Sequence, residues 1–352
     1  AKGIVKREVV RIVTPGTTLD AQGLDESKNN YIMCIVCVGD SFGISIADIS
    51  TGECMVTELD KERKLLDEIN KFMPAEIICN QALLVSGVDT EDLRARLGIC
   101  INPLEDWYFD DDLCRRILME HFHTSTIEGL GIADYESGTI AAGALFQYLY
   151  ETQKSDMAHM TSLTPYVTDR FMLIDSSSRR NLELVETLRE KQKRGSLLWV
   201  LDKTKTAMGA RLLRSYVEQP LIDAGEIELR LAAVEALCDQ AMIRDEIREY
   251  LQPVYDLERL VSRISYQSAN PRDLISFKTS LQMLPFLKQL LHSFPDGLLK
   301  ELDDEMDDLA DLQELIEASI VDDPPFLMKE GGIIKDGYNE TVDNYRNAKK
   351  EG

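Results

Sequence analysis

The stretch Ala47–Glu53, ADISTGE, holds the residues of this chain whose types and spacing come closest to a chemical site. Asp48 follows an apolar run, and an aspartate at a strand end can hold a divalent cation. Two-metal chemistry needs several carboxylates that converge on one point. The later strand ends supply only Glu105 and Asp106, which lie past the end of a predicted strand. We therefore expect Asp48 to close a hairpin or to cap a neighbouring amide.

Two other groups have the residue types of a metal site but unsuitable spacing. Cys34 and Cys37 lie in an apolar run that reads as a strand, on which an odd separation sends side chains to opposite faces. His121 and His123, with Cys114 seven residues earlier, lie in a predicted helix. Residues i and i+2 of a helix do not share a face. We expect core cysteines and no metal site.

No phosphate-binding or nucleophile motif is found in the sequence. G-x-x-x-x-G-K-[ST], G-x-G-x-x-G and G-x-S-x-G are all absent. Trp199 lies in an apolar helical stretch, and we expect it to pack in the core. The residues by themselves therefore predict no catalytic site.

The elements that would position these residues divide into two compositions. The first part, to about residue 150, reads as three antiparallel strands followed by alternating helices and strands. This pattern predicts a small α/β domain of the RNase H-like type. The predicted elements are strands at 30–40, 41–50, 51–59, 75–80 and 98–102, and helices at 60–72 and 136–153.

Beyond a polar segment, the rest of the chain shows helical periodicity and almost no strand signal. We expect a helix with caps at both ends over 176–195, then two helices over 195–221, of which Pro220 ends the second. The fold class expected is an RNase H-like α/β domain followed by an all-α helical domain. The expected boundaries are a remnant linker at 1–18, the α/β domain at 19–150, a linker at 151–168 and the helical domain at 169–352.

Composition excludes several classes of protein. Lys+Arg 39 and Asp+Glu 62 give a net charge of −23, which opposes a free-standing nucleic-acid binder. Seven cysteines, an odd number, fit a reduced cytoplasmic chain. No apolar run approaches the roughly 20 residues of a membrane span. A basic run at 179–214 and an acidic run at 301–323 predict solvated helix faces or a docking surface.

Several long, collinear stretches resemble the MutS family of DNA mismatch repair proteins, and together they cover nearly the whole chain. They are KREVVRIVTPGT, DISTGE, FMLIDSSSRRNLELVETLR, GSLLWVLDKTKTAMGARLLRSYVEQPL, YDLERLVSRISYQSANPRDL and EGGIIKDGYNETVDNYR.

The resemblance implies that the chain is an internal piece of such a protein, with its connector domain, its core domain and a truncated lever helix. The chain lacks an initiator Met, ends just after a helix begins at Asn339, and has no F-x-E mismatch-probing motif. The mismatch-reading, clamp and ATPase parts of the parent, with ATP and Mg²⁺ as its cofactors, would then lie elsewhere. The fragment itself would not be an enzyme and would hold no cofactor.

The resemblance also implies partners. The connector would dock MutL, mismatched duplex DNA would bind only through other domains, and the parent would be a homodimer. The role expected of this piece is allosteric coupling between the ATPase and the DNA-gripping domains. Lys61, Arg63 and Lys64, on an exposed helix face, are the candidate partner-binding residues. Two alternatives stay open: a metal-dependent nuclease that binds Mg²⁺ or Mn²⁺ near Asp48, and a helical scaffold unrelated to repair.

Overall fold

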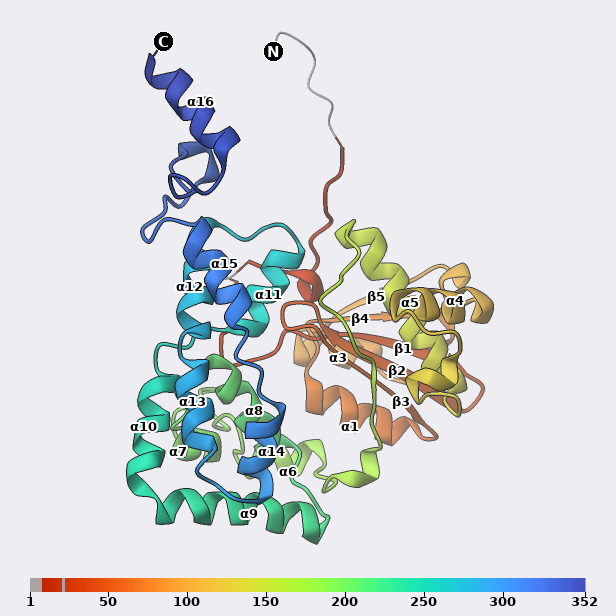
Figure 1. The fold of residues 1–352 in the computed structure, drawn as a ribbon. Coiled ribbons are helices and arrows are strands. Elements are labelled where there is room, and N and C mark those ends of the chain that lie inside the picture. The colour runs from red at the N-terminus through yellow and green to blue at the C-terminus, as the bar shows by residue number, and fades with distance from the viewer. Residues whose placement is uncertain (1–7, 21–22, 352) are drawn as a thin grey trace. The chain divides into compact units, whose positions relative to one another are not determined.

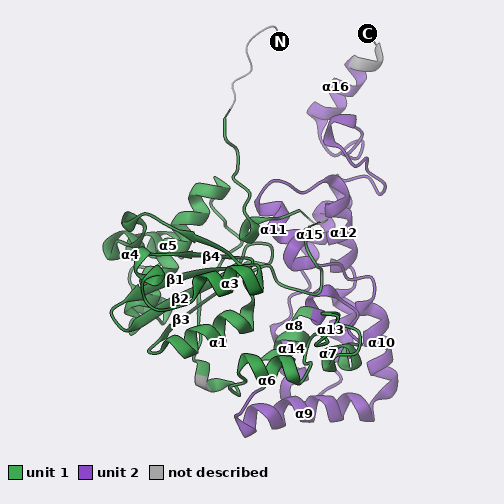
Figure 2. Cartoon of the chain, turned by 180° about the vertical axis from the view of Figure 1, so that it is seen from behind, with its two compact units in different colours: residues 1–202, 211–220 green, residues 203–210, 221–352 purple. Residues whose placement is uncertain are grey.

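The computed structural model describes residues 8–20 and 23–351, which form two compact units (Figure 1, Figure 2). Unit 1 comprises Ala1–Asp202 and Arg211–Pro220. Unit 2 comprises Lys203–Ala210 and Leu221–Gly352. The two are described separately below.

Unit 1 is built on a mixed six-stranded sheet in the order β5-β4-β1-β2-β3-β6. The pairs β1–β2 and β2–β3 are antiparallel, whereas β1–β4, β4–β5 and β3–β6 are parallel. The strands are β1 Ile32–Val38, β2 Ser41–Asp48, β3 Glu53–Leu59, β4 Glu76–Cys79, β5 Cys100–Pro103 and β6 Thr164–Pro165.

The first hairpin forms where the sequence predicts it. β1 and β2 are joined by Gly39 and Asp40, and Gly39 has φ of 60°, a conformation that glycine adopts at no steric cost. The residues of β1 from Ile32 to Val36 are at most 1% exposed, because helices cover both faces of the sheet.

One face of the sheet packs against α1 (Glu62–Phe72) and α3 (Thr90–Leu97) through a continuous apolar core. The core includes Met33, Ile35, Ile44, Leu65, Ile69, Phe72 and Leu93. The apolar side chains of α1 recur at three- and four-residue spacing, which explains why this helix forms with one buried face. The short α2 (Gln81–Leu84) adds Leu83 to the same core.

The other helix pair of unit 1 is α5 (Glu136–Gln153), which contacts β1, β2 and β3, and α4 (Asp111–His121), which packs on α5. The approach of α5 to the sheet is very close at Gly43, where a Cβ atom would stand 2.0 Å from the Ser137 carbonyl oxygen. Glycine is therefore required at this position for the helix to reach the sheet.

The C-terminal part of unit 1 contains α6 (Ser176–Asn181), α7 (Leu197–Leu201) and most of α8 (Ala207–Glu218). The helix predicted over 176–195 is wrong beyond Asn181. The chain turns instead, because Glu183 and Lys191 have φ of 48° and 53° and cannot continue a helix.

The expected burial of Trp199 is also wrong. Its side chain is 47% exposed on the short helix α7. The N-cap residue of this helix, Ser196, accepts a hydrogen bond from the Trp199 N–H through its hydroxyl. Five apolar residues in one helix cannot all face a single core, and Leu198 takes the buried position.

Unit 2 is helical, as predicted. Two apolar clusters form its interior. One contains Leu260, Phe277 and Leu281, and the other contains Leu291, Phe294 and Leu299. The helices are α9 Ala224–Asp239, α10 Ala241–Leu251, α11 Leu257–Ser265, α12 Pro271–Leu281, α13 Leu284–Leu291, α14 Gly297–Glu305, α15 Ala310–Ser319 and α16 Glu340–Glu351.

A mixed sheet followed by many helices confirms the predicted fold class. The helix α16 begins where the sequence predicts, and the Val342 N–H donates to the side-chain oxygen of Asn339 at 3.1 Å. Over residues 8–20 and 23–351, none of the helices combines the length and apolar character that crossing a lipid bilayer demands.

Candidate functional site

Asp48 lies at the end of β2, is fully buried and accepts hydrogen bonds. Its Oδ1 accepts from the Ser50 N–H at 2.8 Å and the Ser50 hydroxyl at 2.7 Å, and its Oδ2 accepts from the Asn30 N–H at 2.9 Å. This geometry confirms the expectation that Asp48 closes the hairpin and caps neighbouring amides. Glu105 and Asp106 follow β5, as predicted.

The two cysteines considered above lie in the core of unit 1, and of the two histidines His121 is partly buried and His123 is exposed. Cys34 and Cys37 are free and buried, and Cys37 packs in the α1–α3 core. His121 ends α4, with Nδ1 at 2.6 Å from the Tyr150 hydroxyl and Nε2 at 2.7 Å from the Met160 carbonyl oxygen. In the part of the chain that the structure describes, no three His, Cys, Asp or Glu side chains are grouped so that they could hold a metal ion.

The three candidate partner-binding residues lie together at the start of α1. Lys61 precedes the helix as its N-cap residue, and Lys61 and Arg63 are exposed. The Lys64 ammonium is 2.9 Å from the Asp60 carboxylate. An exposed pair of this kind contributes little to stability. The structure thus brings the three cations onto one solvent-facing turn.

Nearer the C-terminal end of α1 lies a buried ion pair. The Lys71 ammonium is 2.7 Å from the Glu68 carboxylate, and both side chains are at most 7% exposed. The Tyr166 hydroxyl donates to Glu68 at 2.8 Å, and the Lys71 ammonium lies 4.6 Å from the Phe72 ring centroid. Burial lowers the pKa of Lys71, while Glu68 opposes that shift. The sequence gives only one signal for this pair, its i, i+3 spacing.

Further charges lie next to this pair within unit 1. Arg214 pairs with Glu218 at 3.3 Å along α8, and the Arg179 Nε–H donates to the Ile174 carbonyl oxygen at 3.0 Å. Burial lowers the pKa of Arg179 and raises that of Glu218, and the nearby charges partly offset both shifts. Sequence inspection misses this cluster, because its members lie on α1, α6 and α8, far apart along the chain.

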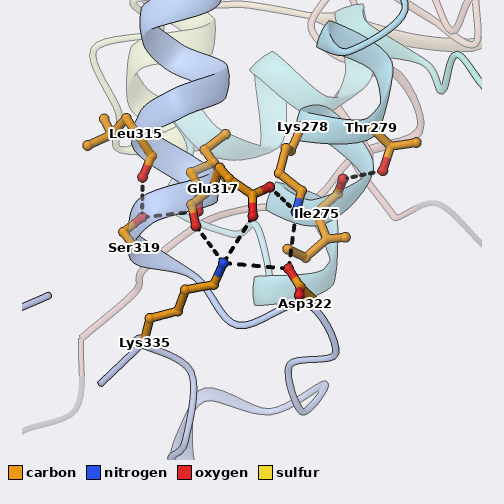
Figure 3. Close-up of polar contacts among 9 residues, drawn as sticks. Ile275, Lys278, Thr279, Leu315, Glu317, Ser319, Asp322 and Lys335 are labelled. Atoms are coloured by element: carbon orange, nitrogen blue, oxygen red, sulfur yellow. Dashed lines mark hydrogen bonds and ion pairs between the residues drawn. The ribbon is translucent and has the colours of Figure 1, made fainter. Parts of the chain in front are cut away.

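Unit 2 contains an ionic cluster of its own (Figure 3). Lys278 of α12 is 2.8 Å from the Glu317 carboxylate of α15 and 3.4 Å from Asp322. Lys335 lies 3.1 Å from Glu317 and 3.6 Å from Asp322, and its ammonium also donates to the Glu317 carbonyl oxygen at 2.7 Å. Two lysines and two carboxylates thus join two helices to the segment that leads to α16.

Comparison with known proteins matches both halves of this chain to one family. The model of MutS domain II matches residues 30–161, and the model of MutS domain III matches residues 177–351. The chain is 58% identical over 352 residues to the DNA mismatch repair protein MutS of Lachnoclostridium phytofermentans. It is 47% identical over 355 residues to that of Ruminiclostridium cellulolyticum and 44% identical over 355 residues to that of Acetivibrio thermocellus.

Each of the three alignments includes the whole of this chain. They include only 38%, 40% and 40% of the length of those three proteins. The chain therefore spans well under half the length of the curated relatives it matches.

Proposed function

Because the chain belongs to the MutS family of DNA mismatch repair proteins, we propose that it forms the central, coupling part of such a protein. Its two matched regions are domains II and III of the family. In the proposal they transmit a change between the ATPase of the parent and its mismatch-binding and clamp domains. The parent would be a cytoplasmic homodimer that uses ATP and Mg²⁺, and mismatched duplex would bind to its other domains. In this proposal residues 19–150 form the centre of the connector domain, with the flanking segments packed on it, and the helical core domain follows from about residue 169.

The observation that carries this proposal is the match of domains II and III, in order, along 58% identical sequence. The ATPase would lie outside this chain. We therefore expect the 352-residue chain to hydrolyse no ATP above a blank in a phosphate-release assay, with or without mismatched duplex. Turnover that persists in rigorously purified chain would contradict the proposal.

We further propose that the region of domain II docks MutL through the exposed start of α1. Lys61, Arg63 and Lys64 present three cations at the exposed start of one helix, and their removal would leave the buried side chains of α1 untouched. Transient partners often use small, polar interfaces, which agrees with this choice of face. Charge reversal of all three should weaken MutL binding measurably.

The experiment is biolayer interferometry of the 352-residue chain against MutL of the same organism. The variant combines Lys61→Glu, Arg63→Glu and Lys64→Glu. The control combines Arg115→Glu, Arg116→Glu and Lys154→Glu, which changes net charge equally on other elements of unit 1. Loss of binding in the first variant alone supports the proposed face. Equal binding by both variants overturns it.

A further inference from the structure

Unit 1 contains a pocket of about 640 Å³ that the proposed function does not use. It lies between the C-terminal end of α1, α3 and the segment that contains α6 and the turns after it. Its volume falls within the roughly 300–1,000 Å³ of ligand sites. Apolar side chains line part of it: Met73, Leu97, Leu184 and Val185.

The lining of this pocket has the opposite charge to the chain as a whole. Three carboxylates line it, those of Asp92, Glu186 and Glu218. The cations are twice as many, which gives a formal excess of 6 − 3 = +3 in a chain of net charge −23. They are Lys28, Arg96, Arg179, Arg180, Lys191 and Arg214. Such a local excess favours an anionic ligand.

Two of these cations, Arg96 and Lys191, are held by exposed ion pairs, whereas the pair of Arg214 with Glu218 is largely buried. Arg96 is 3.0 Å from Asp92 and Lys191 is 3.1 Å from Glu186, in pairs whose side chains are 45–58% exposed. Exposed pairs contribute about 0.2–1 kcal/mol, so a ligand carboxylate can replace them at small cost. Arg180 is exposed and, among the residues that the structure describes, forms no ion pair.

The arrangement suits an extended acidic peptide better than a single phosphate. The guanidinium groups come from different elements, with Arg96 on α3, Arg180 on α6 and Arg214 on α8, and apolar side chains lie among them. The N–H groups of Ser177 and Ser178 at the start of α6 already donate to the Asp175 carboxylate, both at 3.0 Å. They are not free to surround a phosphate.

We propose that this pocket binds an acidic segment of a partner polypeptide, in which carboxylates flank an apolar side chain. The peptide carboxylates accept hydrogen bonds from Arg96 and Arg180, because a guanidinium matches a carboxylate with two parallel N–H donors. The apolar side chain packs on Leu97 and Leu184. This site is separate from the exposed face of α1, and the proposal does not depend on MutL docking.

The test uses the 352-residue chain and a fluorescein-labelled peptide of sequence ELEELE, followed by fluorescence anisotropy. We expect saturable binding that weakens as salt is added. The variant Arg96→Glu/Arg180→Glu should weaken binding by at least roughly tenfold. The control Arg116→Glu/Lys154→Glu, of equal charge, should stay within about twofold. Arg180→Glu alone breaks no ion pair of α3, so it should still lower affinity if the double variant folds poorly.

Sodium pyrophosphate serves as the competing anion. If the peptide binds, and pyrophosphate displaces it no better than sodium chloride does at the same ionic strength, the result supports a peptide site. Binding of pyrophosphate without binding of the peptide overturns the proposal in favour of a small-anion site. Absence of both, or equal peptide binding by the pocket and control variants, overturns the pocket itself.

Discussion

At the scale of single residues, unit 1 depends on buried polar side chains whose partners come from distant parts of the chain. Glu76, at the start of β4, is 1% exposed. It accepts hydrogen bonds from the Gly16 N–H at 3.1 Å, the Tyr148 hydroxyl at 2.8 Å and the Thr14 hydroxyl. One carboxylate thus joins the segment before the sheet, the sheet and α5.

Removal of this carboxylate should be costly. Glu76→Ala removes the acceptor of the buried Gly16 N–H and Tyr148 hydroxyl, so we expect the free energy of unfolding to fall by about 3 kcal/mol. The exposed Glu105→Ala should change it by less than about 0.5 kcal/mol. Urea denaturation followed by circular dichroism measures both. Equal midpoints for the two variants would show that Glu76 does not hold these segments together.

Two partly buried histidines make the stability of unit 1 depend on pH. Burial lowers the pKa values of His121 and His159 from the ordinary value of 6.5. Because the carbonyl oxygens of Met160 and Ile49 can only accept, each Nε2 carries the proton that bonds to them. As the pH falls below about 6.5, the unfolded chain binds protons more readily than the folded chain. Stability is complete above that pH and is lost as the pH approaches the lowered values.

We therefore expect the urea midpoint to fall between about pH 7.5 and about pH 5.5. The double variant His121→Asn/His159→Gln should show a smaller fall, although it is less stable at the higher pH. His123→Asn is the control, since His123 is exposed with φ of 52°, which Asn tolerates. A fall of the same size in the double variant and the wild type would exclude these two residues as its source.

The sequence predicts the local residue roles and misses the distant ones. The role of Asp48 follows from its place in a hairpin, because Ser50 lies two residues away. The role of Glu76 does not, since Gly16 and Tyr148 lie 60 and 72 residues away. Hydrogen-bond partners at such separations are set by the packing of whole elements, which residue spacing alone does not reveal.

At the scale of elements, the ionic cluster of unit 2 fixes the segment that precedes α16. The Val321 N–H donates to the Ile333 carbonyl oxygen at 2.9 Å, and the Lys335 N–H donates to the Ser319 carbonyl oxygen at 2.8 Å. The side chains of Lys278 and Glu317 lie beside this short pairing (Figure 3). The cluster thus joins α12 and α15 to the base of α16.

Loss of one cation from this cluster should loosen the pairing without unfolding unit 2. In Lys335→Met, the amides of Val321 and Lys335 should exchange their hydrogens several-fold faster, because local opening becomes easier. Amides of α12 should be unaffected. Lys329→Met is the control, since Lys329 is exposed in the same segment. Mass spectrometry measures the hydrogen-exchange rates. Equal exchange rates of these amides in the two variants would show that the cluster contributes nothing to this pairing.

Elements were predictable wherever a period and a cap coincided. The hairpin has apolar runs on both sides of Gly39, and α16 has an apolar stripe after its cap residue Asn339. In α1 the apolar stripe alone was enough, because its N-cap residue Lys61 makes no side-chain cap hydrogen bond. The region 176–195 has caps at each end but too few apolar residues at helical spacing between them, so it turns after α6. Cap residues mark where a helix can begin or end, whereas a buried stripe decides whether it persists.

At the scale of the whole molecule, the sheet of unit 1 draws on more of the chain than residues 19–150. β6 pairs with β3 at Thr164–Pro165, and the side chain of Tyr166 packs in the α1–α3 core. Ahead of the sheet, the Ile12 N–H donates to the Thr152 carbonyl oxygen at 2.7 Å. Both flanking segments are therefore part of the packed domain that we propose as the docking module.

This packing predicts how excised pieces of domain II behave. A fragment of residues 8–168 keeps β6 and four buried side chains that a fragment of residues 19–150 loses. These are Met157, Met160, Leu163 and Tyr166. Burial of each contributes about 1.5–3 kcal/mol, and their sum is comparable with the roughly 5–15 kcal/mol that stabilises a whole domain. The longer fragment should unfold cooperatively in urea, and the shorter one should be largely unfolded in buffer.

Dispersed amide resonances in a ¹H–¹⁵N NMR spectrum would identify the folded fragment, and interferometry would then compare its affinity for MutL with that of the 352-residue chain. Binding by a folded 8–168 fragment would place the docking surface within domain II. A folded fragment that does not bind, beside a 352-residue chain that does, would place part of the surface outside it. If residues 19–150 alone gave a cooperative transition and dispersed resonances, the side chains from Met157 to Tyr166 would contribute far less than their burial indicates.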